Sequence, residues 1–154
     1  MASTVTSATL SVKISETITL NGVARDSSTT ASISSIRDIS NRIIEVTNAE
    51  HGTQLLKVAA TAAAVGAGTY DKTAVKYVRV TNLDDTNFII LQFTDESTHH
   101  WEVKVEAGKS YVIGDTSSVD DQADIDNFSA SALTLIAAKA DTAQCDVELY
   151  IAAT

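Results

Sequence analysis

Apolar and polar residues alternate along much of this chain, in short runs separated by residues that favour turns. The clearest alternation covers Leu10 to Leu20, where Leu10, Val12, Ile14, Ile18 and Leu20 share one parity and serine, threonine or lysine takes the other. This pattern predicts a long strand with one buried face. Asn21-Gly22 follows it and predicts a two-residue hairpin turn, because both residues tolerate positive φ. Residues 23–35 are rich in serine and threonine and are predicted to be a returning edge strand or a loop.

The next two segments are less regular. Isoleucine and valine positions between Ile36 and Val46 predict one or two short strands that end at Asn48, before a turn at Gly52. Residues 54–65 fit two structures, since alanine favours a helix while Leu56 and Val58 alternate with other positions as in a strand. We favour the strand, because the surrounding segments are β.

Four apolar runs separated by three polar turns lie between Ala74 and Gly114, and they predict a four-stranded meander. One of these runs, FIILQF at residues 88–93, is apolar on both faces. An antiparallel sheet usually exposes one face to water, so a doubly apolar strand must be covered on its second side. A loop, the other sheet or another subunit could cover it.

The remaining segments complete an all-β pattern. Residues 119–127 are predicted to be an acidic loop, and two strands with a turn between them are predicted to close the chain. Eight or so strands predict an antiparallel β-sandwich with little or no helix; jelly-roll topology is one option, and a β-barrel is the alternative. We expect residues 1–9 to be an extended arm and residues 10–154 to be a single domain.

Composition and charge narrow the classes of partner. The chain has 154 residues, is 44% hydrophobic and carries a formal net charge of −9. Because phosphate binding needs clustered basic residues, a nucleic-acid partner is disfavoured. No run approaches the roughly 18 apolar residues that span a bilayer, and the first residues do not form a signal peptide. We therefore expect synthesis in a reducing cytoplasm.

The sequence contains no recognisable catalytic or cofactor site, and we expect the protein not to be an enzyme. Cys145 alternates in phase with apolar neighbours and is predicted to be buried. His99 and His100 would point to opposite faces of a strand, and with His51 they are predicted to be surface residues. A less favoured hypothesis is a calcium site in the acidic loop, whose candidate ligands are Asp120, Asp121, Asp124 and Asp126.

Two segments resemble structural proteins of tailed-phage virions. The first runs from TNLDDTNF to VEAGKSYVIG and has an N-L-x-x-T-N turn and a G-x-S turn; the second is ADIDNFSASALTLIAAKADTAQCDVELYIAAT. Together they cover about half of the chain, and residues 22–72 have no part in the resemblance.

This resemblance implies a capsid decoration or cement protein, which stabilises the head lattice by binding its own copies, often as a trimer, and the major capsid protein. The acidic charge favours the outer surface of the capsid over the genome-lined interior. The candidate interface residues are Val5 in the arm and, in the FIILQF strand, Phe88, Ile89, Ile90, Leu91 and Phe93. The alternatives are a tail or neck component, such as an adaptor, fibre or knob, and a calcium-dependent lectin-like module.

Overall fold

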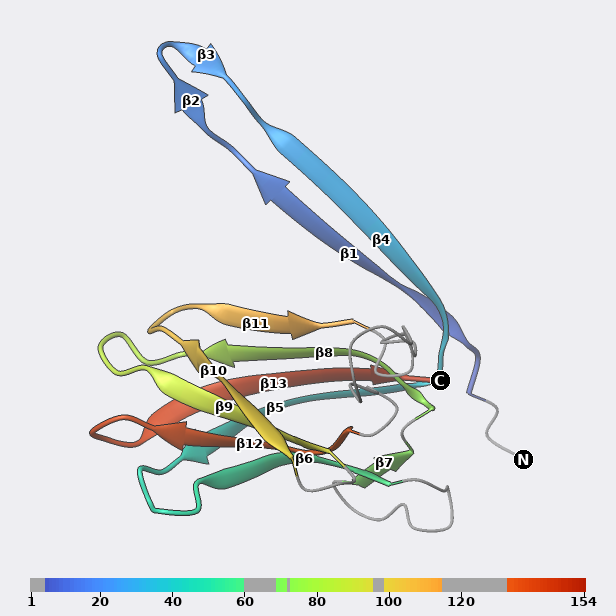
Figure 1. The fold of residues 1–154 in the computed structure, drawn as a ribbon. Coiled ribbons are helices and arrows are strands. Elements are labelled where there is room, and N and C mark those ends of the chain that lie inside the picture. Colours follow the sequence, from blue (N-terminus) through green and yellow to red (C-terminus); the bar gives the residue numbers. More distant parts are fainter. Residues whose placement is uncertain (1–4, 60–68, 72, 96–98, 115–132) are drawn as a thin grey trace.

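Two β-sheets packed face to face form the body of the molecule (Figure 1). The structure is a computed structural model that describes residues 5–59, 69–71, 73–95, 99–114 and 133–154. One sheet has the strand order β10-β9-β12-β6-β7, with bounds His100–Val105, Ile89–Asp95, Leu133–Ala140, Thr53–Ala59 and Thr69–Asp71. The other has the order β11-β8-β13-β5, with bounds Ser110–Ile113, Val75–Asn82, Cys145–Ala153 and Asp38–Val46. The predicted all-β sandwich is thus confirmed, with β6 and β7 as a parallel pair.

The core lies between the two sheets and follows the alternation of the sequence. In β13, Val147, Leu149 and Ile151 are fully buried, whereas the intervening side chains face outward. The ring of Phe93 stacks on that of Trp101 with 5.1 Å between centroids, and it meets the ring of Tyr111 at 5.7 Å. Because Phe93 belongs to one sheet and Tyr111 to the other, this cluster joins the two layers.

The pairing of β8 to β11 differs from the predicted meander. All four strands are present, but β8 pairs with β11 and β9 pairs with β10, in different sheets. The chain therefore crosses from one sheet to the other after β8 and returns after β10. Turn signals in the sequence show where a chain reverses, but they do not show which sheet receives the next strand, and this is why the meander was wrong.

The side chain of Asn82 connects these two crossings. It is completely buried, and its Nδ2 donates to the carbonyl oxygens of Asn87 at 2.8 Å and Val105 at 3.3 Å. Its Oδ1 accepts from the backbone N–H of Asp84 at 3.1 Å, and its own N–H donates to the carbonyl of Lys109 at 2.9 Å. One amide thus satisfies backbone groups of both connections, as burial requires.

A long β-hairpin, formed by residues 8–36 and called the ribbon below, projects from one end of the sandwich (Figure 1). Its strands are β1 (Ala8–Glu16) and β4 (Ser27–Ile36), with the short pair β2 (Thr19–Leu20) and β3 (Val23–Ala24) near the tip. The tip is the predicted Asn21-Gly22 turn, with φ of 51° and 76°. The expected boundary between an arm and a sandwich domain at residue 10 therefore falls inside the ribbon, and the sandwich begins with β5.

Other expectations have mixed outcomes. Residues 53–59 form β6, so the strand reading is confirmed for that part of residues 54–65, and the rest lies outside the described residues. Gly52 has the positive φ of a turn, at 62°. The acidic loop and its four calcium candidates lie outside the described residues.

Replacing Asn82 by alanine should destabilise the sandwich by about 3 kcal/mol, because buried backbone groups of both crossings lose their partner. Urea unfolding at one fixed protein concentration measures the effect. Asn41→Ala is the matched control, since Asn41 is exposed on β5 and its loss should cost about 0.5 kcal/mol or less. Equal unfolding midpoints for the two variants would contradict the role given to Asn82.

Candidate interaction surfaces

One face of the ribbon carries nearly all of its large apolar side chains. Leu10 pairs with Ile33 and Leu20 pairs with Val23, and ten residues separate these pairs on each strand, so the register is uninterrupted between them. Paired residues lie on the same face of a sheet, and every second residue joins them there. The apolar residues of this face, called the apolar face below, are Leu10, Val12, Ile14, Ile18, Leu20, Val23, Ala31 and Ile33. The same face also carries Glu16, Arg25, Ser27 and Thr29. The opposite face consists mainly of serine and threonine.

Only the base of this apolar face is covered by the sandwich. Ile36, Tyr77 and Ala152 are buried together, and Leu10, Val12, Ile33 and Tyr150 pack against them. The rings of Tyr77 and Tyr150 meet edge to face with 6.0 Å between centroids. Tyr77, Tyr150 and Ala152 project from the outer face of the four-stranded sheet, opposite to the core, so the ribbon rests on that face at its base.

Two local distortions separate the ribbon from the sandwich. The register between β1 and β4 shifts between Ala8 and Leu10, which is a bulge, and bulges bend a strand. Ser35 has a positive φ of 64°, which is uncommon for a residue other than glycine. Arg37 alone connects β4 to β5, and its N–H donates to the carbonyl of Ala153 at 2.8 Å. The ribbon therefore leaves the sandwich immediately beside the end of β13.

The outer half of the apolar face has no cover among the described residues. Ile14, Ile18, Leu20 and Val23 are 54% to 58% exposed. Figure 1 shows this part of the ribbon far from both sheets. In addition, β1 and β4 hydrogen-bond only to each other among the described strands, so both outer edges of the ribbon are open.

A second apolar surface lies on the end strand β5 of the four-stranded sheet. Ile39 and Ile43 project from its outer face and are 54% and 67% exposed. The strand ends beside an acidic groove of about 440 Å³. The residues that line this groove are Glu45, Leu83, Asp84, Asp85, Gln144 and Asp146.

Asp84 also has a structural task at the edge of that groove. Its Oδ1 accepts from the backbone N–H groups of Asn87 at 2.6 Å and Thr86 at 2.8 Å. These two hydrogen bonds hold the pKa of the Asp84 carboxyl below its ordinary value. The carboxylate therefore keeps its negative charge over the whole neutral and weakly acidic range.

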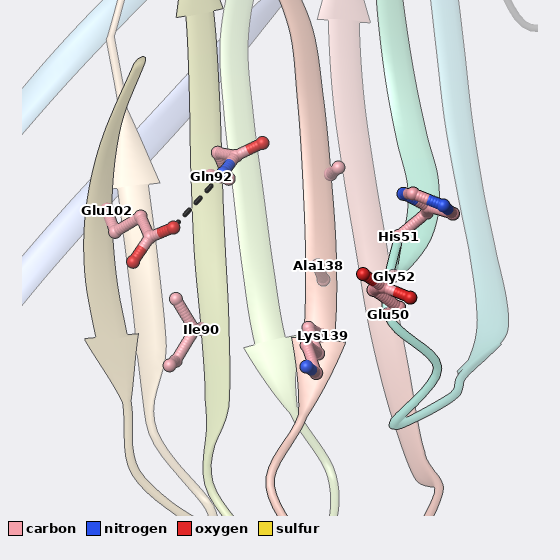
Figure 2. A pocket seen from close by; sticks show the side chains of 9 residues that line it. Glu50, His51, Gly52, Ile90, Gln92, Glu102, Ala138 and Lys139 are labelled. Atoms are coloured by element: carbon pink, nitrogen blue, oxygen red, sulfur yellow. Dashed lines mark hydrogen bonds between the residues drawn. The ribbon is translucent and has the colours of Figure 1, made fainter.

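A third feature is a groove of about 450 Å³ on the outer face of the five-stranded sheet. Figure 2 shows Gln92 and Glu102 on its one side, joined by a hydrogen bond of 3.0 Å, with Glu50 and His51 across from them. Carboxylates, an imidazole and Lys139 could hold a small polar ligand. The described residues contain no group of three or more histidines, cysteines, aspartates or glutamates that could hold a metal ion.

The structure divides the candidate interface residues between the core and the surface. Ile89, Leu91 and Phe93 are 0% to 2% exposed within the single chain, so the core already covers them. Ile90 is half-buried in the floor of the third groove, between Lys104 and Lys139 of the neighbouring strands. Phe88 is half-buried, and the Nζ atom of Lys104 lies 4.0 Å from the centroid of its ring. Val5 is exposed.

The predicted burial of Cys145 and exposure of the histidines are confirmed. Cys145 is 1% exposed, and desolvation raises the pKa of its thiol. His51, His99 and His100 are all exposed, and His99 Nδ1 lies 3.2 Å from Asp95 Oδ2. None of these side chains belongs to the ribbon surface.

Sequence reasoning found the apolar pattern of the ribbon but assigned it to the core. The alternation from Leu10 to Leu20 predicts a buried face, and the structure leaves most of that face exposed. The Ser- and Thr-rich return strand was the available signal, because a strand with few apolar residues cannot contribute a core layer. The exposed pair Ile39 and Ile43 was also missed as a surface, since isoleucines in a short strand fit a core equally well.

Comparison of the chain with protein-family models, with curated proteins and with solved structures gives no match. No helix long and apolar enough to cross a membrane is found in the described part of the chain. The surfaces themselves are therefore the basis for an assignment of function.

Gly52 lines the third groove, and replacing it by alanine should lower the stability of the protein. A Cβ atom on Gly52 would lie 2.5 Å from the backbone oxygen of Ala138, whereas one on Gly108 would meet nothing within 4 Å, although both glycines have positive φ. We expect Gly108→Ala to cost about 1 kcal/mol for backbone conformation alone, and Gly52→Ala to cost clearly more. Chemical denaturation of both variants measures the difference, and equal losses would show that the β5–β6 loop moves away freely.

Proposed function

We propose that this chain is a non-enzymatic structural protein that acts by binding other proteins through its ribbon. Its resemblance to tailed-phage virion proteins supports the more specific proposal of a capsid decoration or cement protein. In that role it would bind its own copies and the major capsid protein on the outer surface of the head. Stabilising the shell by these contacts would be its activity.

The observation that carries the proposal is the uncovered apolar face of the ribbon. A two-stranded hairpin is marginally stable in water unless another strand or surface covers it. From Leu10 to Leu20 the ribbon extends for roughly 33 Å, at about 3.3 Å for each residue. Its uncovered part carries Ile14, Ile18, Leu20 and Val23, with Glu16 and Arg25 among them. Apolar side chains that gather on an exposed surface in this way usually mark an interaction site.

The energy available from this surface favours a repeated contact over a single one. Full burial of an isoleucine, leucine or valine side chain is worth about 1.5 to 3 kcal/mol. The four side chains of the outer half are already partly covered, so burying the rest yields about 1 kcal/mol each. A total of about 4 kcal/mol barely offsets the cost of association, which is about 4 kcal/mol or more. A lattice or closed oligomer repeats the contact and thereby gains the stability that one contact lacks.

The charge of the chain supports the outer surface as its location. At a net charge of −9, the protein is repelled by packaged nucleic acid. The ribbon has no net charge, so it can approach another acidic protein with little repulsion.

We expect immunogold labelling of particles, purified from cells that produce the chain, to mark the head shell. Label confined to the tail or neck would contradict the role in capsid decoration and support the tail-component alternative. Particles without label would contradict any virion role. Loss of binding on addition of a calcium chelator would favour the lectin-like alternative.

The same particles test the role of the ribbon. Ile18→Asp combined with Leu20→Asp should reduce occupancy of the particle at least tenfold, because two carboxylates then replace apolar contacts. Thr17→Asp combined with Thr19→Asp is the matched control, since it adds the same charge to the polar face of the ribbon. Equal occupancy for both double variants would show that the apolar face does not bind the particle.

A further inference from the structure

We propose that the ribbon of one copy docks on the outer face of the four-stranded sheet of a second copy, along β5. The inference rests on the proposed function, because it names the partner of the same apolar face. It adds a specific acceptor surface, and that surface is present in every copy of the chain. The contact is therefore heterologous: each copy gives its ribbon to one neighbour and receives the ribbon of another.

The acceptor strand matches the ribbon in length and in spacing. β5 has nine residues, as does β1, and it is an end strand of its sheet. Ile39 and Ile43 are four residues apart on its outer face with Asn41 between them. Ile14 and Ile18 are four residues apart on the ribbon with Glu16 between them, so Glu16 would face the side-chain amide of Asn41. Four residues of extended chain measure about 13 Å on either strand, so the two pairs can face each other.

The ribbon already packs against this same sheet face within one copy. Its base covers Tyr77, Tyr150 and Ala152, and Ala152 is the direct cross-strand neighbour of Ile39. The apolar surface thus continues from the covered residues to the exposed Ile39 without a break. Figure 1 shows the outer half of the ribbon directed away from its own sheets, which leaves the far end of β5 for another molecule.

Charge also favours a second copy as the occupant. Within the ribbon, the basic side chains of Lys13 and Arg25 balance the acidic ones of Glu16 and Asp26, so residues 8–36 have a net charge of zero. Residues 1–7 have no charged side chain, so residues 37–154 carry the whole net charge of −9. Two bodies of this charge repel each other, whereas the ribbon of one copy and the body of another do not.

Arg25 is the basic residue of the ribbon that could meet the acidic groove of a second copy. It pairs with Ile18, because its N–H donates to the carbonyl of Ile18 at 2.8 Å, so its side chain lies on the apolar face of the ribbon. The acidic groove at the end of β5 contains Glu45, Asp85 and Asp146. A ribbon laid along β5 with its tip toward this groove brings the guanidinium to the carboxylates and the apolar tip residues to the half-exposed Leu83.

Mixing of two variants tests the heterologous contact. Ile18→Asp damages the ribbon and leaves the acceptor intact, while Ile43→Asp does the reverse. We expect light scattering after size-exclusion chromatography to show oligomers for the unaltered chain and at least a tenfold weaker association for each variant. An equimolar mixture should form one-to-one dimers but no larger oligomers, because each mixed pair retains one intact ribbon and one intact acceptor. Thr17→Asp and His100→Asp, at exposed positions outside both surfaces, are controls that should associate as the unaltered chain does.

Cysteine cross-linking tests the contact directly, since the natural Cys145 is buried. A copy with Ile14→Cys and a copy with Ile39→Cys should form a mixed disulfide dimer on oxidation at least tenfold faster than a pair in which Ser15→Cys replaces Ile14→Cys. Circular dichroism establishes that each variant is folded.

Three results would overturn the inference: an unaltered chain that stays monomeric at all concentrations, an Ile43→Asp variant that associates normally, or equal cross-linking from both faces of the ribbon. The failure of the proposed function is distinguishable from each of these. If the ribbon variants lose particle binding while the protein is monomeric, the ribbon binds a different protein and the structural role stands. If oligomers form as expected but the particle carries no label, the contact between copies stands and the virion role fails.

Discussion

The contact between the base of the ribbon and the outer face of the four-stranded sheet determines what this molecule can do. It buries Ile36, Tyr77 and Ala152 and then ends, because the ribbon departs from the sandwich at a bulge and at Ser35. A longer contact would make the ribbon a third layer of one domain. The short contact instead fixes the direction of the ribbon and leaves its outer half uncovered among the described residues.

The sandwich provides the rigidity that such an arm requires. Its core is made of β-branched and leucine side chains with one aromatic cluster, and the buried amide of Asn82 joins the two crossings between the sheets. The hairpin of β9 and β10 lies between β8 and β11 in the chain, so the two sheets are joined by two connections at this point.

A contact between the two exposed apolar surfaces, one on the ribbon and one on β5, would account for both of them. A ribbon with one apolar face and an end strand with two exposed isoleucines would each be an aggregation risk in an isolated monomer. In the proposed contact the two surfaces belong to different copies and would cover one another. The polar face of the ribbon, which is serine and threonine, then remains in water.

The sequence by itself determined the strands, the all-β class, the Asn21-Gly22 turn and the burial of Cys145, because alternation and turn chemistry are local properties of the chain. It also identified the apolar parity from Leu10 to Leu20, but it could not say whether that face meets its own core or another molecule. The tertiary structure decided that question, together with the crossing of β8 to β9 and the burial of Ile89, Leu91 and Phe93. The physical reason is that a strand has the same pattern whichever surface covers it, and only the packing of distant segments determines which surface that is.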